Sequence, residues 1–185
     1  MNGLYLIKPT SIASTGSGNS SSISANGSVT FSSCETLSLN GVFSADYDNY
    51  MIVMRGSATN STYIHARLRA SGTDASGSNY TKQYVAAYGT TVSSARVTST
   101  TALEVGYSYG DPYGLKYGII CHLFGPYLAQ PTASRSVVAA DYLNAYIHDT
   151  ACTHSLSTAY DGITILIETA GRPVTGLVGV YGMVK

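Results

Sequence analysis

Side chains of the kinds that bind metals gather at one place in the sequence. Four of them fall within seven residues: His148, Asp149, Cys152 and His154. Zinc sites use these ligand types, usually as two close pairs, and here a fourth ligand would have to come from His122 or His65. On a strand, the side chains of residues 148, 152 and 154 would share one face. The other interpretation is a polar segment around a small buried thiol. We predict no bound metal and no other cofactor.

The sequence gives little support for a catalytic nucleophile or a pair of catalytic acids. Ser, His and Asp are present, but we assign no serine to the strand–turn–helix elbow that activates hydrolase nucleophiles. Asp46 and Asp48 form the one close carboxylate pair, and they fit a turn in which Asp and Asn bond their own backbone. Glu104 and Glu168 each lie beside apolar residues, as buried acids or as strand-end residues. We therefore predict a protein that is not an enzyme.

Tyrosine dominates the aromatic residues, with 16 Tyr against three Phe and no Trp. A Tyr/Gly segment over residues 106–118 carries four of them, which are predicted binding residues: Tyr107, Tyr109, Tyr113 and Tyr117. Tyrosine offers a large amphipathic contact area at low rotamer cost, which suits sugar stacking or a protein interface. The alternative is that these tyrosines replace Phe and Trp in a sheet-rich core.

Residues 63–70 form the clearest amphipathic strand. Apolar side chains at 64, 66, 68 and 70 point one way, and His65, Arg67 and Arg69 point the other. We predict that Arg67 and Arg69 bind a carboxylate-bearing partner or an anionic glycan. The alternative is an ordinary solvated face.

The composition excludes several classes of protein. The 185 residues carry ten Lys plus Arg and ten Asp plus Glu, together with 25 Ser and 20 Thr. Zero net charge argues against binding nucleic acid by phosphate neutralisation. No apolar run is long enough to span a bilayer, and no secretory signal is visible. Cys34, Cys121 and Cys152 are odd in number and widely spaced, which predicts three reduced thiols and assembly in a reducing cytoplasm.

Short runs broken by Gly, Pro, Asn and Asp predict eight to ten strands and no capped helix. The runs lie at residues 28–31, 36–39, 51–54, 63–70, 80–88, 117–124, 163–168 and 174–184. Residues 137–148 fit either helical or strand spacing, and we favour a strand. The predicted class is all-β, a two-sheet β-sandwich of jelly-roll type.

We predict that residues 1–33 form an extended N-terminal arm and residues 34–185 the sandwich domain. Residues 10–28 have the Ser/Gly/Asn composition of a flexible linker. Ile12, Ile23, Val29 and Phe31 recur in and just after it. These apolar residues indicate a segment that orders against a neighbour rather than folding by itself.

Residues 37–54, with their Gly-Val-Phe and Tyr-Asp-Asn-Tyr motifs, resemble a group of marine and cyanobacterial phage virion proteins. The likeness continues in an Arg-Leu-Arg-x-Ser-Gly-Thr-Asp element over residues 67–74, in Tyr80, and in a Gly-x-x-x-Val-Tyr-Gly strand over residues 176–182. A long stretch between these motifs has no match. The resemblance implies fibre, knob or decoration subunits, commonly homotrimers with β-sandwich domains.

The resemblance implies a non-enzymatic virion structural protein, a homo-oligomeric appendage such as a short tail fibre, knob or capsid decoration. It would be made in the host cytoplasm, exposed on the particle, and attached through its N-terminal arm. Its expected partners are further copies of itself, other virion proteins and a host-surface glycan, without nucleic acid or membrane insertion. The alternative is a free glycan-binding lectin with the same sandwich.

Overall fold

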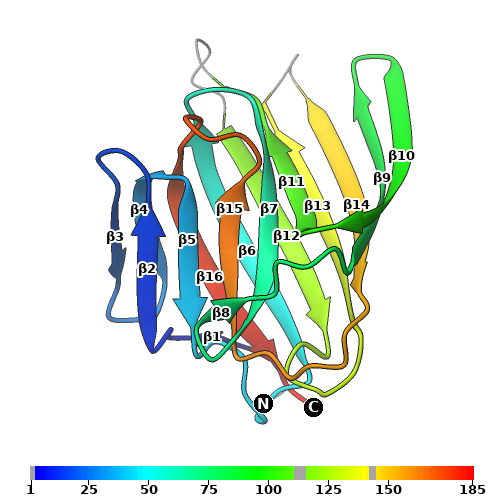
Figure 1. Cartoon of the computed structure of the whole chain (residues 1–185). Helices are drawn as coiled ribbons and strands as arrows, with labels where there is room; N and C mark the ends of the chain where they lie inside the picture. The colour runs from blue at the N-terminus through cyan, green and yellow to red at the C-terminus, as the bar shows by residue number, and fades with distance from the viewer. Residues whose placement is uncertain (1–2, 111–115, 142–144) are drawn as a thin grey trace.

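Strands make up the regular structure of this chain. The computed structural model describes residues 3–110, 116–141 and 145–185, and these contain sixteen strands and no helix. The strands form two antiparallel sheets packed face to face (Figure 1). The chain passes repeatedly from one sheet to the other, as between β4, β5, β6 and β7. The predicted all-β, two-sheet sandwich of jelly-roll type is confirmed.

The larger sheet has ten strands. In spatial order they are β10 (Thr91–Thr100), β9 (Tyr80–Tyr88), β14 (Tyr146–His154), β13 (Thr132–Ala140), β12 (Lys116–Phe124), β6 (Asn49–Ala58), β16 (Val174–Met183), β4 (Val29–Cys34) and β3 (Ser20–Ile23), with β1 (Leu4–Ile7) paired to β16. The smaller sheet has six strands. They are β11 (Leu103–Ser108), β7 (Thr62–Ala70), β15 (Gly162–Ile167), β5 (Thr36–Asn40) and β2 (Ser11–Thr15), with β8 (Thr73–Asp74) paired to β7.

The core lies between the two sheets, and every second side chain along a strand points into it. Along β12, Tyr117, Ile119, Cys121 and Leu123 are buried and the residues between them are more exposed. Buried apolar residues of β6 and β16, in the same sheet, and of β7 and β15, in the opposite sheet, belong to the same core. All three cysteines are unpaired, as predicted, and all three are buried. Burial raises the pKa of the Cys121 thiol to about 12, which keeps it protonated.

The predicted boundary between an arm and a body is wrong, because the boundary falls within β4. Strands from residues 4–34 pair with both sheets: β1 and β4 with β16, and β2 with β5. Val29 and Phe31 are core residues. The Ser/Thr-rich composition misled the sequence interpretation, because backbone pairing and hydroxyl bonds hold these strands. Ser14 and Ser21, for example, lie 2.9 Å apart across β2 and β3.

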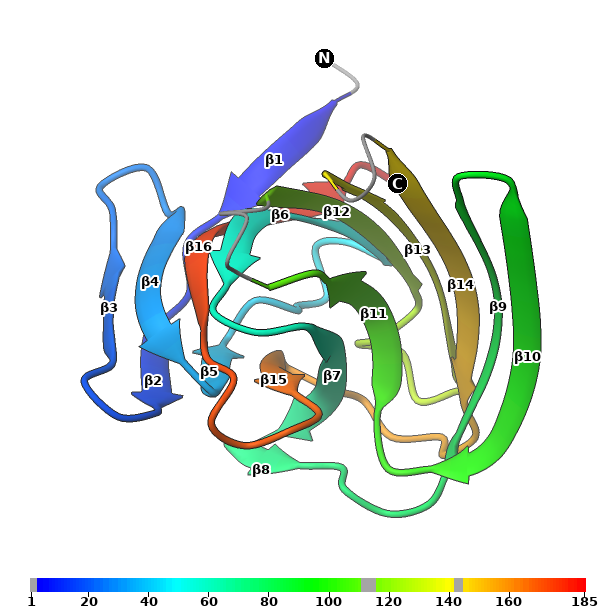
Figure 2. The same ribbon diagram turned by 90° about the horizontal axis from the view of Figure 1, so that it is seen from above.

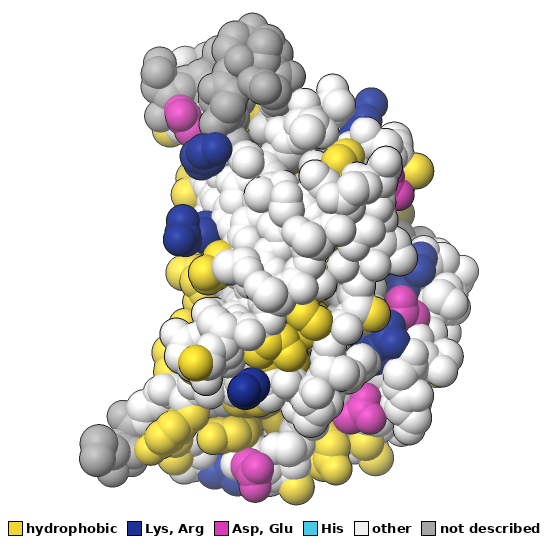
Figure 3. Space-filling model, turned by 90° about the vertical axis from the view of Figure 1, so that its left-hand side faces the viewer, with side chains coloured by type: hydrophobic (Ala, Val, Ile, Leu, Met, Phe, Trp, Pro, Cys, Tyr) yellow, Lys and Arg dark blue, Asp and Glu magenta, His cyan; other side chains and the backbone are white. Residues whose placement is uncertain are grey.

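Figure 3 shows the side of the molecule on which β2–β4 lie. Backbone and uncharged polar side chains, drawn in white, cover most of it, with fewer hydrophobic and charged side chains between them. The residues with the composition of a linker therefore form an ordered flank of the sandwich.

The predicted strand over residues 137–148 is also wrong in extent. It spans the end of β13 and the start of β14, which pair as antiparallel neighbours with Ala140 opposite Tyr146. The strand preference of the residues was correct, but no strong Gly or Pro signal marks the reversal. Tyr142, which contributed to the helical alternative, lies outside the described residues.

The ten-stranded sheet curls around the free edge of the six-stranded sheet. Viewed from above, the β9–β10 hairpin stands beside β11 rather than over the core (Figure 2). β10 is exposed along nearly all its length and pairs with β9 alone. This curl brings the inner face of β9 and β14 against the outer face of β7 and β11.

A core substitution inside the expected arm tests whether these residues belong to the sandwich. We expect Phe31→Ala to lower the free energy of unfolding by about 3–5 kcal/mol, because it leaves a cavity in the core. The matched control is Phe124→Ala, at a side chain that is 44% exposed, with an expected cost below about 1 kcal/mol. Urea denaturation measures both, and equal small costs would contradict the assignment.

Candidate functional site

The curl of the larger sheet creates two grooves side by side. The tyrosine groove has a volume of about 250 Å³ and is lined by Tyr63, Tyr84, Ala86, Tyr88, Ser93, Tyr107, Tyr109, Tyr146 and His148. The basic groove has a volume of about 430 Å³ and is lined by His65, Arg67, Lys82, Val97, Ser99, Thr100, Thr101, Ala102, Leu166, Ile167 and Glu168. Both grooves lie between the β9–β10 hairpin and the outer face of β7.

A β-bulge in β11 puts two functional side chains on one face. Glu104 pairs with His65 and Tyr107 with Tyr63, but the register shifts between Glu104 and Gly106, so Val105 is an extra residue. Without the bulge, Glu104 and Tyr107 would point to opposite faces, since they are an odd number of positions apart. With it, both lie beside the residues of β7 that point away from the core.

Gly106 allows β11 to lie close against the larger sheet. A Cβ at this position would meet Val138 Cγ2 at 2.5 Å and Ile119 Cδ1 at 3.0 Å. A larger residue would push β11 away from β12 and β13. The glycine therefore contributes to the position of the whole strand and of the side chains it carries.

The carboxylate of Glu104 lies between the two grooves, and its side chain is fully buried. Lys82 Nζ donates to its Oε2. His65 Nε2 lies 3.9 Å from Oε2, and His148 Nε2 lies 3.1 Å from Oε1. Lys82 and His65 line the basic groove and His148 the tyrosine groove, so one carboxylate connects both.

The surroundings of Glu104 favour its ionised form. Burial alone would raise the pKa of this carboxyl group, but contacts from His148, His65 and Lys82 outweigh burial and hold the pKa well below its usual range. The group is therefore a carboxylate at neutral pH. An ionised carboxylate cannot donate a proton as a general acid.

The tyrosine rings of the groove hold one another in fixed orientations. Tyr63 and Tyr107 meet edge to face with ring centroids 4.7 Å apart, as do Tyr107 and Tyr109 at 4.7 Å. Tyr109 meets Tyr146 in the same way at 5.0 Å. These distances and angles are the ones that aromatic pairs prefer. The groove is therefore preformed.

Polar groups contact two rings of the tyrosine groove. The Tyr146 hydroxyl lies 2.9 Å from His148 Nδ1, and Lys82 Nζ lies 5.3 Å from the centre of the Tyr63 ring. Burial, followed by the nearby Glu104 charge, raises the pKa of Tyr63 to about 12. Burial is also the main cause that raises the pKa of Tyr146. The phenols stay neutral and act as hydrogen-bonding groups rather than as nucleophiles.

The four predicted binding tyrosines do not form one site. Tyr107 and Tyr109 line the tyrosine groove. Tyr117 is a core residue on the inner face of β12, buried to 3% exposure, so for this residue the core interpretation is the correct one. Tyr113 lies outside the described residues. The other groove tyrosines come from β7, β9 and β14, and sequence reasoning did not select them.

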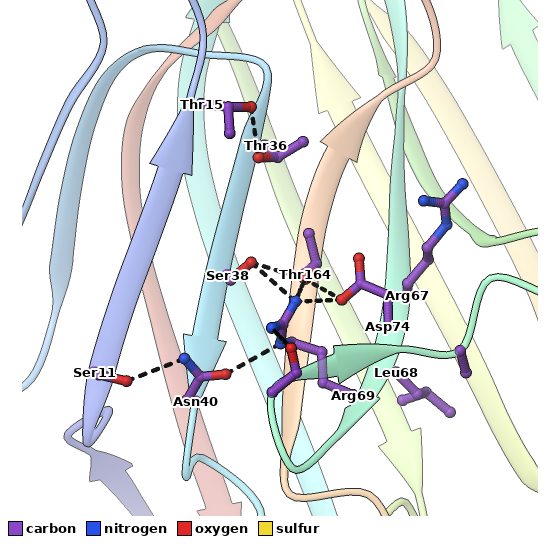
Figure 4. Close-up of polar contacts among 12 residues, drawn as sticks. Ser11, Thr15, Thr36, Ser38, Asn40, Arg67, Leu68, Arg69, Asp74 and Thr164 are labelled. Carbon is purple, nitrogen blue, oxygen red and sulfur yellow. Dashed lines mark hydrogen bonds and ion pairs between the residues drawn. The ribbon is translucent and has the colours of Figure 1, made fainter.

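The two predicted arginines have different environments. Arg69 is taken up by internal contacts: it pairs with Asp74 and donates to Asn40 Oδ1 at 3.1 Å, to Thr164 Oγ1 at 2.6 Å, and to Ser38. It links β5, β7, β8 and β15, so its donors are used within the protein and we do not include it in the candidate site. Figure 4 shows Arg67 directed away from this network. Arg67 lines the basic groove, where its Nε donates to the Thr101 carbonyl at 3.1 Å.

A Gly-x-Ser-x-Gly spacing occurs at residues 106–110. In hydrolases such a serine stands on a turn between a strand and a helix. Here Ser108 is the last residue of β11, is buried, and donates weakly to the Tyr109 carbonyl at 3.4 Å. The motif is therefore part of a strand rather than a nucleophile elbow.

Three side chains of the possible metal cluster, His148, Cys152 and His154, share the buried face of β14, as the strand interpretation predicted, and Asp149 lies on the other face. His148 contacts Tyr146 and Glu104, and His154 Nε2 lies 2.6 Å from the Tyr160 hydroxyl. The Cys152 thiol is directed to the Glu104 carbonyl oxygen at 3.6 Å. Within residues 3–110, 116–141 and 145–185, no three His, Cys, Asp or Glu side chains are grouped so as to hold a metal ion.

Comparisons with known proteins give distant structural likeness alone. No family model and no curated protein matches the chain. Among solved structures, a peanut lectin with a nine-residue peptide aligns over 100% of this chain and 99% of its own, with 6% sequence identity and a TM-score of 0.35. A likeness at this level carries no argument about the site. The resemblance to phage virion proteins stays a prediction. In the described residues, no helix is long and apolar enough to cross a membrane.

The ionised state of Glu104 can be tested through the pH dependence of stability. We expect Glu104→Gln to lower the free energy of unfolding at pH 7 by about 3–5 kcal/mol, because it breaks a buried ion cluster. The difference should narrow as the pH falls below about 4.5, the ordinary pKa of the group, since the unfolded wild-type chain then takes up a proton that the native carboxylate does not.

The matched control is Glu168→Gln, at an exposed carboxylate that lines the basic groove, and it should leave the pH dependence unchanged. Urea denaturation between pH 7 and pH 3 measures both variants. A difference between wild type and Glu104→Gln that stays constant over this range would contradict a lowered pKa.

Proposed function

We propose that this protein is a non-enzymatic carbohydrate-binding β-sandwich, and that a saccharide lies in the tyrosine groove. One observation carries the proposal: six tyrosine rings from β7, β9, β14 and the end of β11 line a single preformed groove. Aromatic faces pack against the apolar C–H faces of sugar rings, and phenol hydroxyls bond sugar hydroxyls. Both surfaces are present here without further rearrangement.

The chemistry of Glu104 supports binding rather than hydrolysis. Glycosidases use one carboxyl group as a proton donor and place a second on the other side of the scissile bond. The carboxylate of Glu104 is fully buried, ionised and occupied by Lys82, His65 and His148. Its role is to hold the side chains of Lys82, His65 and His148, and the tyrosine rings beside them, in place.

Removing one stacking ring should weaken saccharide binding. We expect Tyr84→Ala to reduce affinity by about tenfold to a hundredfold, because a buried aromatic contact contributes about 1.5–3 kcal/mol. The control is Tyr5→Ala, at a tyrosine that is 47% exposed on β1, outside the groove. A glycan array identifies the ligand and calorimetry measures its affinity. Equal affinities for the two variants, or the absence of any saccharide ligand, would overturn the proposal.

As a second candidate, we propose the virion appendage that the sequence resemblance implies, assembled from copies of this chain. The observation in its favour is an apolar outer face on the ten-stranded sheet. Exposed side chains of adjacent strands gather there: Val85, Val92, Ile120, Val137 and Ile147. Ile147 is 59% and Val92 is 70% exposed. Arg135 and Asp149 on this face pair with each other, so these two side chains bring no net charge to a contact with a second copy.

Light scattering of the purified chain at low micromolar concentration tests assembly. We expect a multiple of the 19.4 kDa monomer mass for the wild type, three times that mass for a trimer, and the monomer mass for Ile147→Glu. Leu156→Glu, at an exposed leucine on a loop, is the matched control and should keep the wild-type mass. A monomeric wild type would remove the support for this second candidate.

A further inference from the structure

The basic groove adjoins the tyrosine groove along the same strands. On β7, Tyr63, His65 and Arg67 project from one face, and successive members are about 7 Å apart along the strand. Tyr63 lies in the tyrosine groove, and His65 and Arg67 lie in the basic groove. The rings of Tyr63 and His65 are stacked, with centroids 6.2 Å apart. An oligosaccharide with one ring on Tyr63 can therefore place a further ring near Arg67 by following β7.

The charges of the basic groove are not equally available to a ligand. The charge of Lys82 is neutralised by its buried ion pair with Glu104. His65 lies within 3.9 Å of the same carboxylate. Arg67 uses its Nε for the Thr101 carbonyl. Among the described residues, its two terminal nitrogens have no hydrogen bond or ion pair.

Arg67 thus presents the paired donors of its guanidinium group toward the basic groove. A planar guanidinium matches the two oxygens of a carboxylate and binds them in parallel. Glu168, the acidic residue of this groove, is exposed at its rim, where water and salt screen its charge. Ser99 and Thr101 also line the groove and are exposed, and their hydroxyl groups suit a polar sugar ring.

We propose that the basic groove is a subsite for a carboxylate-bearing sugar, with Arg67 binding the carboxylate while a neighbouring ring of the same saccharide lies in the tyrosine groove. The inference rests on the proposed carbohydrate-binding function and names its substrate class, acidic oligosaccharides. Arg67 determines specificity, and the tyrosine rings supply affinity shared by acidic and neutral sugars.

Two pairs of probes test the subsite on the full-length chain. Trigalacturonate is compared with its methyl ester, which keeps the sugar rings and removes the charge, and 3′-sialyllactose is compared with lactose. In calorimetry we expect at least one acid to bind about tenfold or more tighter than its neutral counterpart. Which pair shows the preference distinguishes a uronic acid from a sialic acid.

Arg67→Gln should lower the affinity for the acid to that of the neutral counterpart and leave neutral binding unchanged. Arg67→Lys should recover part of the preference, since the charge remains but the paired donors do not. Arg96→Gln is the matched control, because Arg96 is exposed on β10 and lies outside both grooves. It should bind like the wild type.

The outcomes separate this inference from the function on which it rests. If neutral saccharides bind through Tyr84 but no acid is preferred, or if Arg67→Gln keeps the preference, the acidic subsite is overturned and the carbohydrate-binding function stands. If no saccharide binds at all, the proposed function fails and the subsite with it. A preference lost equally in Arg67→Gln and Arg96→Gln would show general charge attraction and also overturn the subsite.

Discussion

The buried carboxylate of Glu104 determines the arrangement of the side chains around it. An isolated charge in the interior is strongly unfavourable, so the carboxylate requires partners that stay close. Those partners come from three different strands: Lys82 from β9, His65 from β7 and His148 from β14. The curled part of the larger sheet is thereby bound to the free edge of the smaller one. Both grooves lie beside this contact.

The positions of the groove side chains depend on a bulge and on close packing between strands. The bulge at Val105 turns Glu104 and Tyr107 to the same side, and Gly106 lets β11 lie against the larger sheet. Residues two apart on a strand point to the same side, and on β9 this places Lys82 in the basic groove and Tyr84 in the tyrosine groove. A charged end and an aromatic end on one surface suit a ligand that has both a carboxylate and apolar ring faces.

The sequence predicted those features that depend on local alternation. The amphipathic strand that became β7 was recognised because apolar and polar residues strictly alternate there, and with it the groove residue Arg67. β2 and β3 were missed as separate strands, and residues 90–101 fitted either a strand or a loop. Ser and Thr occupy both faces of β2, β3 and β10, so no hydrophobic period marks them. The partnership of Glu104 with His148 could not be predicted, since it depends on a one-residue bulge and on the curl of a sheet. For Tyr117 a core position was one of two interpretations, and the alternation of buried and exposed residues along β12 decides between them.

The most direct test of this account is to map a bound saccharide on the full-length chain by the chemical shifts of backbone amides. If the grooves form the binding site, the shifts should change along residues 63–67, 82–88, 104–109 and 146–148, on the four strands that Glu104 and its partners connect. The amides of β2 and β3, on the opposite flank, should stay unchanged. Shift changes confined to that flank or to the outer face of the larger sheet would contradict the account.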